Sequence, residues 1–167
     1  MNSCLFILGV VMLFSKKNKN NYISAPVRGS IVPIEKVNDP GFSQKMMGEG
    51  FAVIPEEDIV RAPIDGVIEL TDGMLHAFCM IGSAGEELLV HVGVDTVKLN
   101  GRGFKLLVSH GKKVKRGTPV IEFDRKLVAD EGFDNIVIVA FSNFDEFELE
   151  KLMTEGEQVL HYRSKQI

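Results

Sequence analysis

The sequence predicts an all-β fold, an antiparallel β-sandwich or barrel with only a few short helical turns. Three observations support this prediction: short β-branched runs separated by Gly, Pro, Asn and Asp, a repeated sequence phrase, and few helical patterns. The 167 residues, with 45% hydrophobic and 25% charged side chains, suit one compact domain and exclude a multidomain enzyme. The net charge of -4 provides no positive field, so we expect no binding to nucleic acid.

The first twenty residues are set apart from the expected domain, which covers residues 21–167. The run Cys4–Phe14 is almost entirely apolar and is followed by a polar, lysine-containing stretch. It is too short to span a bilayer, which needs about 20 apolar residues, and its lysines follow the apolar run instead of preceding it as in a secretory signal. Two interpretations stay open: a peripheral membrane anchor whose lysines meet anionic headgroups, and a floppy tail or a wrongly assigned start codon.

Six runs in the body of the chain are predicted to be strands. Each is rich in Val, Ile, Leu or Phe and is bounded by turn residues, at the regular spacing that is typical of sandwiches and barrels. The runs are residues 29–34, 50–54, 66–70, 87–92, 119–123 and 135–140. The best helical candidates, Leu127–Glu131 and Glu146–Met153, are both short.

One phrase occurs twice along the chain. Ala25–Ile31 reads APVRGSI and Ala62–Ile68 reads APIDGVI, which indicates an internal duplication. Proline fixes the entry into a strand and glycine permits a tight turn, so we expect both copies to enter the sheet alike. The alternative is a chance similarity in a β-rich chain.

Two histidines lie inside strand-like apolar runs, where an ionisable side chain is unexpected unless it has a structural or functional role. His76 and His91 could each be a histidine packed in the core. If their strands pair, the two imidazoles could face each other, with one as a nucleophile and the other as a donor. Gly93 would then leave backbone N–H groups open to an anion beside His91. His110 and His161 are expected to be solvated surface residues.

Several motifs follow one another between about Ser24 and Asp145: the repeated A-P phrase and residues 48–52, 76–78, 88–97, 103–104 and 120–124. In this order they resemble the glucose-type IIA component of the bacterial phosphoenolpyruvate-dependent sugar phosphotransferase system. The resemblance implies a sandwich of duplicated hybrid-motif topology and a cytoplasmic phosphotransferase component. Such a component takes a phosphoryl group from the phosphocarrier protein HPr and passes it to a cysteine of a sugar-specific IIB domain. It implies no required cofactor, and it leaves the sugar to the membrane-embedded IIC partner.

The resemblance also assigns roles to individual positions. His91 matches the phosphorylated histidine, His76 the second active-site histidine and Asp95 an acidic residue at the rim. The positions that match the partner-binding face are Asp39, Phe42, Met46 and Met47. One departure is Met74, which stands where the family commonly has a threonine that supplies a hydroxyl to the histidine network.

Two other functions share parts of this pattern. His91 and Asp95 have the H-x-x-x-D spacing of zinc ligands in lysostaphin-type endopeptidases, but the further H-x-H of those enzymes is missing after Asp95. The other alternative is regulatory, because family members inhibit or activate proteins according to their phosphorylation state. In some complexes of the family two histidines, here His76 and His91, join a carboxylate of the partner around a shared zinc ion. Cys4 and Cys79 lie outside any C-x-x-C pairing, so no cysteine-based zinc site is expected.

Overall fold

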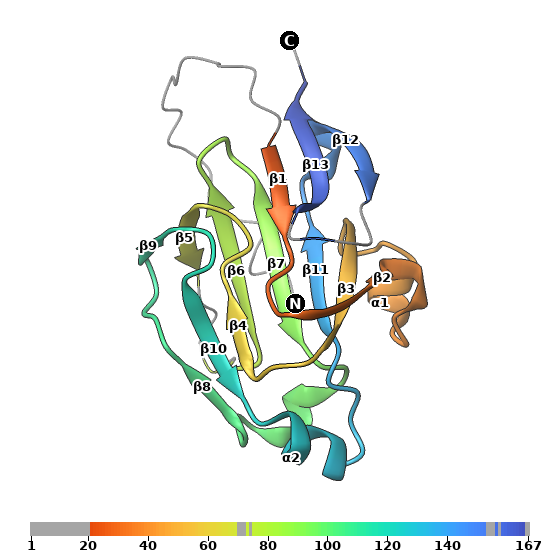
Figure 1. Ribbon diagram of the computed structural model, residues 1–167, viewed down its shortest axis with the longest axis vertical. Helices are drawn as coiled ribbons and strands as arrows, with labels where there is room; N and C mark the ends of the chain where they lie inside the picture. The colour runs from red at the N-terminus through yellow and green to blue at the C-terminus, as the bar shows by residue number, and fades with distance from the viewer. Residues whose placement is uncertain (1–20, 70–72, 74, 153–155, 157, 166–167) are drawn as a thin grey trace.

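A computed structural model describes residues 21–69, 73, 75–152, 156 and 158–165 (Figure 1). The N-terminal segment 1–20 and Met74 therefore lie outside the described residues. The strands are β1 (Asn21–Ser24), β2 (Gly29–Pro33), β3 (Glu49–Pro55), β4 (Ile59–Arg61), β5 (Gly66–Glu69), β6 (Ala77–Gly82), β7 (Glu87–Val92), β8 (Phe104–Leu106), β9 (Lys113–Val114), β10 (Pro119–Phe123), β11 (Val137–Phe141), β12 (Phe147–Leu152) and β13 (Gln158–Ser164). The helical elements are η1 (Ile34–Lys36), α1 (Pro40–Ser43), η2 (Thr96–Leu99), α2 (Arg125–Asp130) and η3 (Phe144–Glu146).

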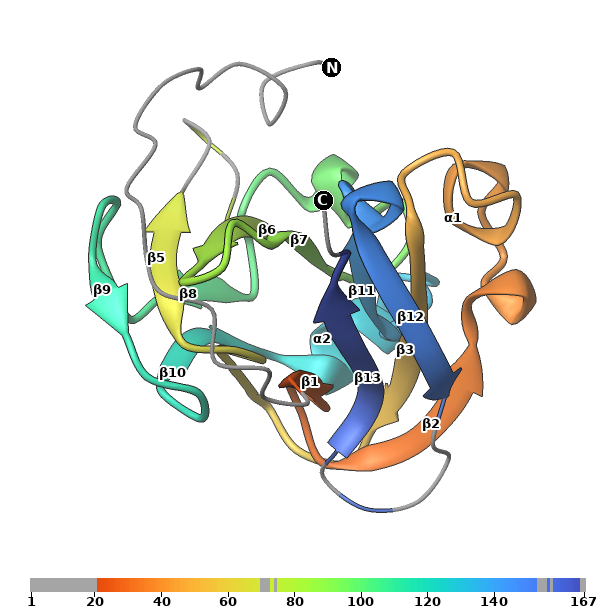
Figure 2. The same ribbon diagram turned by 90° about the horizontal axis from the view of Figure 1, so that it is seen from above.

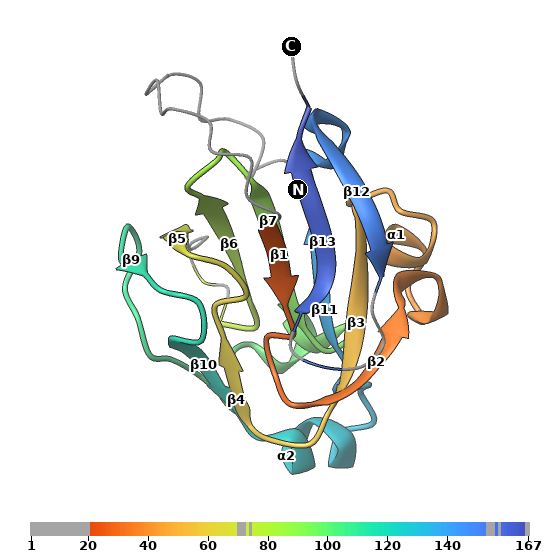
Figure 3. The ribbon, with the colours of Figure 1, turned by 45° about the horizontal axis from the view of Figure 1, so that its top comes forward.

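The strands form antiparallel sheets, which confirms the predicted fold class. The largest sheet has seven strands in the order β2-β3-β11-β7-β6-β5-β9, and two three-stranded sheets have the orders β1-β13-β12 and β4-β10-β8. Figures 1 and 3 show β1 and β13 crossing in front of β7 and β11. All six predicted strands are present, within two residues of their expected bounds.

Each face of the seven-stranded sheet buries its own set of apolar side chains. The main core between the sheets contains the largest buried side chains, among them Phe51, Phe78, Phe123 and Phe141. The opposite face, here called the outer face, carries a smaller cluster that η1 and α1 cover: Ile34, Val37, Phe42, Ala52, Ile136, Ile138 and Ala140. From above, α1 and η2 lie on the side of the sheet away from β1 and β10 (Figure 2). A residue on the outer face therefore lies outside the main core, on the side where η1 and α1 pack.

One of the two predicted helices is present and the other is wrong. α2 begins after Asp124, whose carboxylate accepts a hydrogen bond from the Leu127 N–H at 2.8 Å. The segment predicted as the helix Glu146–Met153 instead contains β12, which pairs with β13. Phe147 packs its ring 5.6 Å from that of Tyr162, so burial against β13 outweighs the local helix propensity of this segment.

The repeated phrase forms a contact between its own two copies. The Ser24 N–H donates to the Pro63 carbonyl at 3.0 Å, and the Arg61 N–H donates to the Pro26 carbonyl at 2.7 Å. Ser24 and Arg61 hold the same position in the two copies, as do Pro26 and Pro63. The two hydrogen bonds are thus equivalent under exchange of the copies, which favours duplication over chance similarity.

The glycines of the phrase also occupy equivalent places. Gly29 begins β2 and Gly66 begins β5. A Cβ added at Gly29 would lie 1.9 Å from the Ile54 carbonyl oxygen, and one at Gly66 would lie 2.3 Å from that of Ile81. Both copies therefore enter the sheet alike, at a point where only glycine allows the neighbouring strand to approach.

The described residues contain no helix long and apolar enough to cross a membrane.

Candidate functional site

The site is centred on His91, which β7 places in the middle of the seven-stranded sheet. Val90 and Val92, on either side of it, point into the main core, so His91 points to the outer face. Its cross-strand neighbours are Ala77 on β6 and Ile138 on β11. Because strands on both sides hold β7, the backbone beneath the His91 ring is fixed.

His76 lies next to His91, as expected if their strands pair. The centroids of the two imidazole rings are 4.9 Å apart and their planes make an angle of 77°. The Val92 N–H donates to the His76 carbonyl at 2.7 Å, which ties the residue before β6 to the end of β7. His76 is only 4% exposed, whereas His91 is half-buried. His91 is therefore the more accessible of the two rings.

One hydrogen bond fixes which nitrogen of His91 is open for chemistry. The Nδ1 atom lies 2.8 Å from the carbonyl oxygen of Gly93. A carbonyl oxygen can only accept, so Nδ1 carries the hydrogen and donates it. In the neutral ring the lone pair is then on Nε2, which makes Nε2 the nucleophilic atom.

The surroundings of both rings favour their neutral forms. Burial, followed by the nearby His76, lowers the pKa of His91 to about 4, although the Gly93 carbonyl and the charge of Asp39 act in the opposite direction. Burial also lowers the pKa of His76. At neutral pH the Nε2 lone pair of His91 is consequently available without prior removal of a proton.

The tight turn after β7 depends on Gly93, which has a φ of 80°. A Cβ at this position would lie 2.3 Å from Cγ2 of Thr96 and 2.8 Å from the carbonyl oxygen of Asp134. The expectation that Gly93 leaves its N–H open to an anion is wrong, because this N–H donates to the Ile136 carbonyl at 2.7 Å. Gly93 instead contributes its carbonyl oxygen, which orients His91.

Asp95 lies on the same turn, immediately before η2. Its backbone is left-handed, with a φ of 60°, and its exposed carboxylate forms an ion pair with Lys98 at 2.9 Å. Thr96, the next residue, is buried and donates from Oγ1 to the Val92 carbonyl at 2.6 Å. This bond anchors η2 to the end of β7, so Asp95 is held four residues beyond His91 on an anchored turn.

The predicted partner-binding residues come from the loop between β2 and β3. Asp39 caps α1 by accepting a hydrogen bond from the Gly41 N–H at 2.7 Å, and its charge acts on His91. The ring of Phe42 is 5.4 Å from that of His91 and is 6% exposed. Met46 and Met47 follow α1 and are 73% and 39% exposed, so their side chains are open to a partner.

Two apolar residues near the site received no role in the sequence analysis. The ring of Phe104 is 6.3 Å from that of His76 and stacks on Phe123 at 6.2 Å, so it supports His76 from the side of β8. Val97 on η2 is 56% exposed, which is unusual for a valine, and it lies two residues from Asp95. The sequence signals for these two residues are the motifs that contain them, residues 103–104 for Phe104 and residues 88–97 for Val97.

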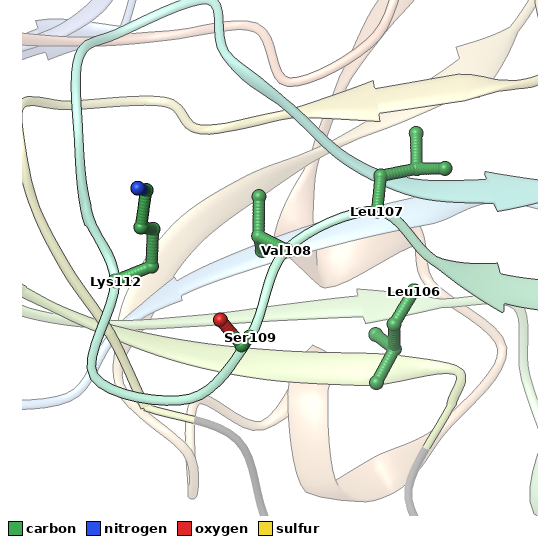
Figure 4. A pocket seen from close by; sticks show the side chains of 5 residues that line it. All are labelled: Leu106, Leu107, Val108, Ser109 and Lys112. Atoms are coloured by element: carbon green, nitrogen blue, oxygen red, sulfur yellow. The ribbon is translucent and has the colours of Figure 1, made fainter.

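The pocket in Figure 4 contributes nothing to this chemistry. It has a volume of about 340 Å³ and is lined by Leu106, Leu107, Val108, Ser109 and Lys112. Figure 4 shows these side chains along β8 and the loop that follows it. None of them is among the predicted site residues.

A catalytic zinc site of the endopeptidase type needs three protein ligands. Within the part of the chain that the structure describes, no group of three or more His, Cys, Asp or Glu side chains could hold a metal ion. Asp95, the second residue of the H-x-x-x-D pattern, is paired with Lys98.

Comparison with known proteins identifies the family. Residues 21–147 match the family model for the phosphoenolpyruvate-dependent sugar phosphotransferase system, EIIA 1. The chain is 42% identical over 131 residues to a glucose-specific EIIA component of Staphylococcus epidermidis, a match that covers 78% of this chain and 79% of that protein. It is also 42% identical over 127 residues to the glucosamine-specific EIICBA component of Bacillus subtilis, covering 76% of this chain and 20% of that protein.

A solved structure gives the same result at the level of the fold. The glucose permease IIA from Mycoplasma capricolum superimposes with a TM-score of 0.79 at 32% sequence identity, covering 86% of this chain and 96% of that chain. The described β-sandwich is thus the fold of this relative. The chain belongs to the glucose-type EIIA family of the phosphoenolpyruvate-dependent sugar phosphotransferase system, whose members are phosphocarriers in sugar uptake.

Proposed function

We propose that His91 accepts a phosphoryl group on Nε2 from phospho-HPr and passes it to a cysteine thiolate of a sugar-specific IIB domain. The observation that carries this proposal is the hydrogen bond from Nδ1 of His91 to the Gly93 carbonyl, which leaves the Nε2 lone pair free. A cytoplasmic location, expected from the family, is part of the proposal.

The transfer needs no general base. The Nε2 lone pair of His91 forms a bond to phosphorus while the bond between phosphorus and the donor's histidine nitrogen breaks, and that nitrogen keeps the electron pair. The phosphorylated ring gains positive charge, which the hydrogen bond from Nδ1 to the Gly93 carbonyl stabilises. The second transfer repeats the process with the thiolate as nucleophile and His91 as leaving group, so the protein is regenerated.

His76 is proposed to donate a hydrogen bond to the phosphoryl oxygens. Its ring makes an angle of 77° with that of His91, so it approaches edge-on. Burial lowers the pKa of His76, and a neutral ring carries one N–H donor. A neutral donor can stabilise the charge that builds up on the transferring group without binding the phosphoryl group too tightly to pass on.

The surface around His91 suits a protein partner with an apolar centre. Met46, Met47 and Val97 present exposed apolar area, and the buried ring of Phe42 lies beside that of His91. Such a collar excludes water when a partner docks, and it places the two reacting atoms in line. Methionine side chains adapt to more than one partner surface, which a carrier with a donor and an acceptor requires.

The direct test is incubation with phosphoenolpyruvate, enzyme I and HPr, followed by intact-mass measurement. The parent chain should gain one phosphoryl group, about 80 Da, and His91→Ala should gain none. His110→Ala is the matched control, because His110 is exposed and should leave the gain unchanged. No gain in the folded parent would overturn the carrier function and leave the regulatory alternative.

We also propose that His76 and His91 can supply two ligands to a zinc ion shared with a partner. Nδ1 of His91 is hydrogen-bonded to the Gly93 carbonyl, so Nε2 would be the atom that binds zinc. A tetrahedral site would need further ligands from the partner. Isothermal titration should therefore detect only weak zinc binding by the chain alone, and tight binding would contradict a shared site.

A further inference from the structure

Lys45 has a backbone conformation that a lysine rarely adopts. It directly follows the C-cap of α1 and has a φ of 59°, in the left-handed region that disfavours residues with a Cβ. Its N–H donates to the Phe42 carbonyl at 2.9 Å, and its own carbonyl accepts from the Gly48 N–H at 3.1 Å. A glycine would adopt this turn more easily, so the lysine side chain should contribute something that offsets the strain.

The side chain of Lys45 joins the two ends of the loop between β2 and β3. Its Nζ lies 2.8 Å from the carboxylate of Glu35 in η1 and 2.9 Å from that of Glu49, the first residue of β3. The hydrogen bonds to Glu35 and Glu49 raise the pKa of Lys45, and the bond from Lys45 lowers the pKa of Glu35. One ammonium group therefore closes the loop that carries Asp39, Phe42, Met46 and Met47.

Apolar packing holds η1 and α1 but does not include the bridge itself. Ile34, Val37 and Phe42 are buried in the cluster on the outer face. Lys45, Glu35 and Glu49 instead line a cavity of about 330 Å³, which Leu149, Leu152 and Leu160 of the β12-β13 pair also line. Because side chains do not fill the space beside these three residues, the shape of the loop there depends on the ion pairs of Lys45 with Glu35 and Glu49.

We propose that Lys45 is a positioning residue, which bridges Glu35 and Glu49 to hold Met46 and Met47 in the orientation that receives the phosphoryl donor. This inference rests on the proposed carrier function. Met46 follows Lys45 directly, so a change in the backbone at Lys45 turns both methionine side chains. His91 belongs to β7, which the bridge does not touch, so its own reactivity is independent of Lys45.

The test measures the initial rate of phosphorylation of His91 while the concentration of phospho-HPr is varied. Lys45→Met keeps most of the length of the side chain but removes the charge. We expect it to raise KM by about three- to tenfold with kcat changed less than about twofold. Lys45→Arg should recover most of the loss. Lys45→Gly relieves the backbone strain but removes the bridge, and it should raise KM at least as much as Lys45→Met.

Two further variants separate the bridge from a general loss of stability. Glu35→Gln removes one of the two ion pairs, and it should raise KM less than Lys45→Met and add little to it in the double variant. Lys115→Met is the matched control, because Lys115 forms an exposed ion pair with Asp65 near β9, at the other edge of the sheet. Its KM should equal that of the parent.

A small phosphoryl donor distinguishes docking from chemistry. Phosphoramidate makes no use of the loop, so it should phosphorylate His91 at the same rate in the parent and in Lys45→Met. Equal KM values for phospho-HPr in these two proteins would overturn the inference alone. Slower reaction of Lys45→Met with phosphoramidate would also overturn it, by placing the effect on His91. A parent that phospho-HPr does not phosphorylate would overturn the carrier function and this inference together.

Discussion

At the scale of single residues, the imidazole ring of His91 is half-buried, and its Nδ1 atom is already hydrogen-bonded to the Gly93 carbonyl. Burial keeps the ring neutral, and the Gly93 carbonyl determines which nitrogen holds the lone pair. These two effects have separate structural origins, the first in the sheet and the second in the turn after β7. Each can therefore be changed without the other.

The pKa of His91 gives a prediction for pH dependence. An NMR titration of the folded protein should show the His91 ring protonating near pH 4, with the hydrogen of the neutral ring on Nδ1. Since an unfolded histidine has a pKa of about 6.5, the unfolded chain takes up this proton first, and stability should fall as the pH is lowered from about 6.5 to about 4. A midpoint near 6.5 in the folded protein would contradict the effect of burial.

The turn after β7 gives a second prediction at this scale. Gly93→Ala should lower the free energy of unfolding by about 3 kcal/mol, because its Cβ meets Thr96 and Asp134 in addition to the left-handed backbone. Gly111→Ala is the control, since Gly111 has a φ of 75° but no atom near its added Cβ, and it should cost only about 1 kcal/mol. Urea denaturation measures both, and equal losses would show that the contacts at Gly93 are relieved.

At the scale of elements, α1 is a single turn that depends on its cap and its contact with His91. Asp39 serves both, because its carboxylate accepts from the Gly41 N–H and its charge raises the pKa of His91. The helix is too short to be stable through its own hydrogen bonds. The orientation of Phe42 against His91 therefore depends on Asp39 and on the burial of Phe42 in the outer-face cluster.

Two substitutions at Asp39 separate these effects. Asp39→Asn keeps a capping oxygen and removes the charge, so it should lower the pKa of His91 further with little loss of stability. Asp39→Ala removes both and should also lower the free energy of unfolding by about 1 kcal/mol. The NMR titration and urea denaturation together measure these changes. A raised pKa of His91 in Asp39→Asn would show that the carboxylate does not act on the ring.

The elements that the sequence predicts well are those whose pattern decides their structure locally. The six β-branched runs became strands because their apolar side chains suit a pleated, buried surface. The segment 147–152 did not follow its helical pattern because Phe147 packs against Phe141 of β11 and Tyr162 of β13, contacts that lie outside the segment itself. In the site, the strands of His76 and His91 pair as expected. The hydrogen bond from the Gly93 N–H to the Ile136 carbonyl, however, depends on how β7 is aligned with β11, and this alignment could not be predicted from the sequence.

At the scale of the whole molecule, the last strand, β13, is tied to the middle of the chain. Tyr162 on β13 donates from its hydroxyl to the buried carboxylate of Glu86 at 2.5 Å, and the other oxygen of Glu86 accepts from the Ala84 N–H at 2.8 Å. Burial and the Glu86 carboxylate raise the pKa of Tyr162, so the hydroxyl stays protonated and remains a donor. This contact holds the C-terminal strand against the β6-β7 hairpin, whose strand β7 carries His91.

Removal of this hydroxyl should weaken the whole fold without changing the site. Tyr162→Phe leaves one oxygen of the buried Glu86 without its donor and should lower the free energy of unfolding by about 1–3 kcal/mol. The His91 resonances should keep their chemical shifts at neutral pH. Urea denaturation and an NMR spectrum check the two parts, and unchanged stability would show that water replaces the hydroxyl.

The position of His91 has a consequence for the order of events in transport. The ring offers one open nitrogen, on one face of one central strand, beside one apolar collar. A donor and an acceptor that both reach this nitrogen compete for the same surface and cannot be bound at once. Under the proposed function the cycle is double-displacement, and a reciprocal plot of its kinetics should give parallel lines. An excess of spent donor should then slow delivery to the acceptor by occupying the carrier.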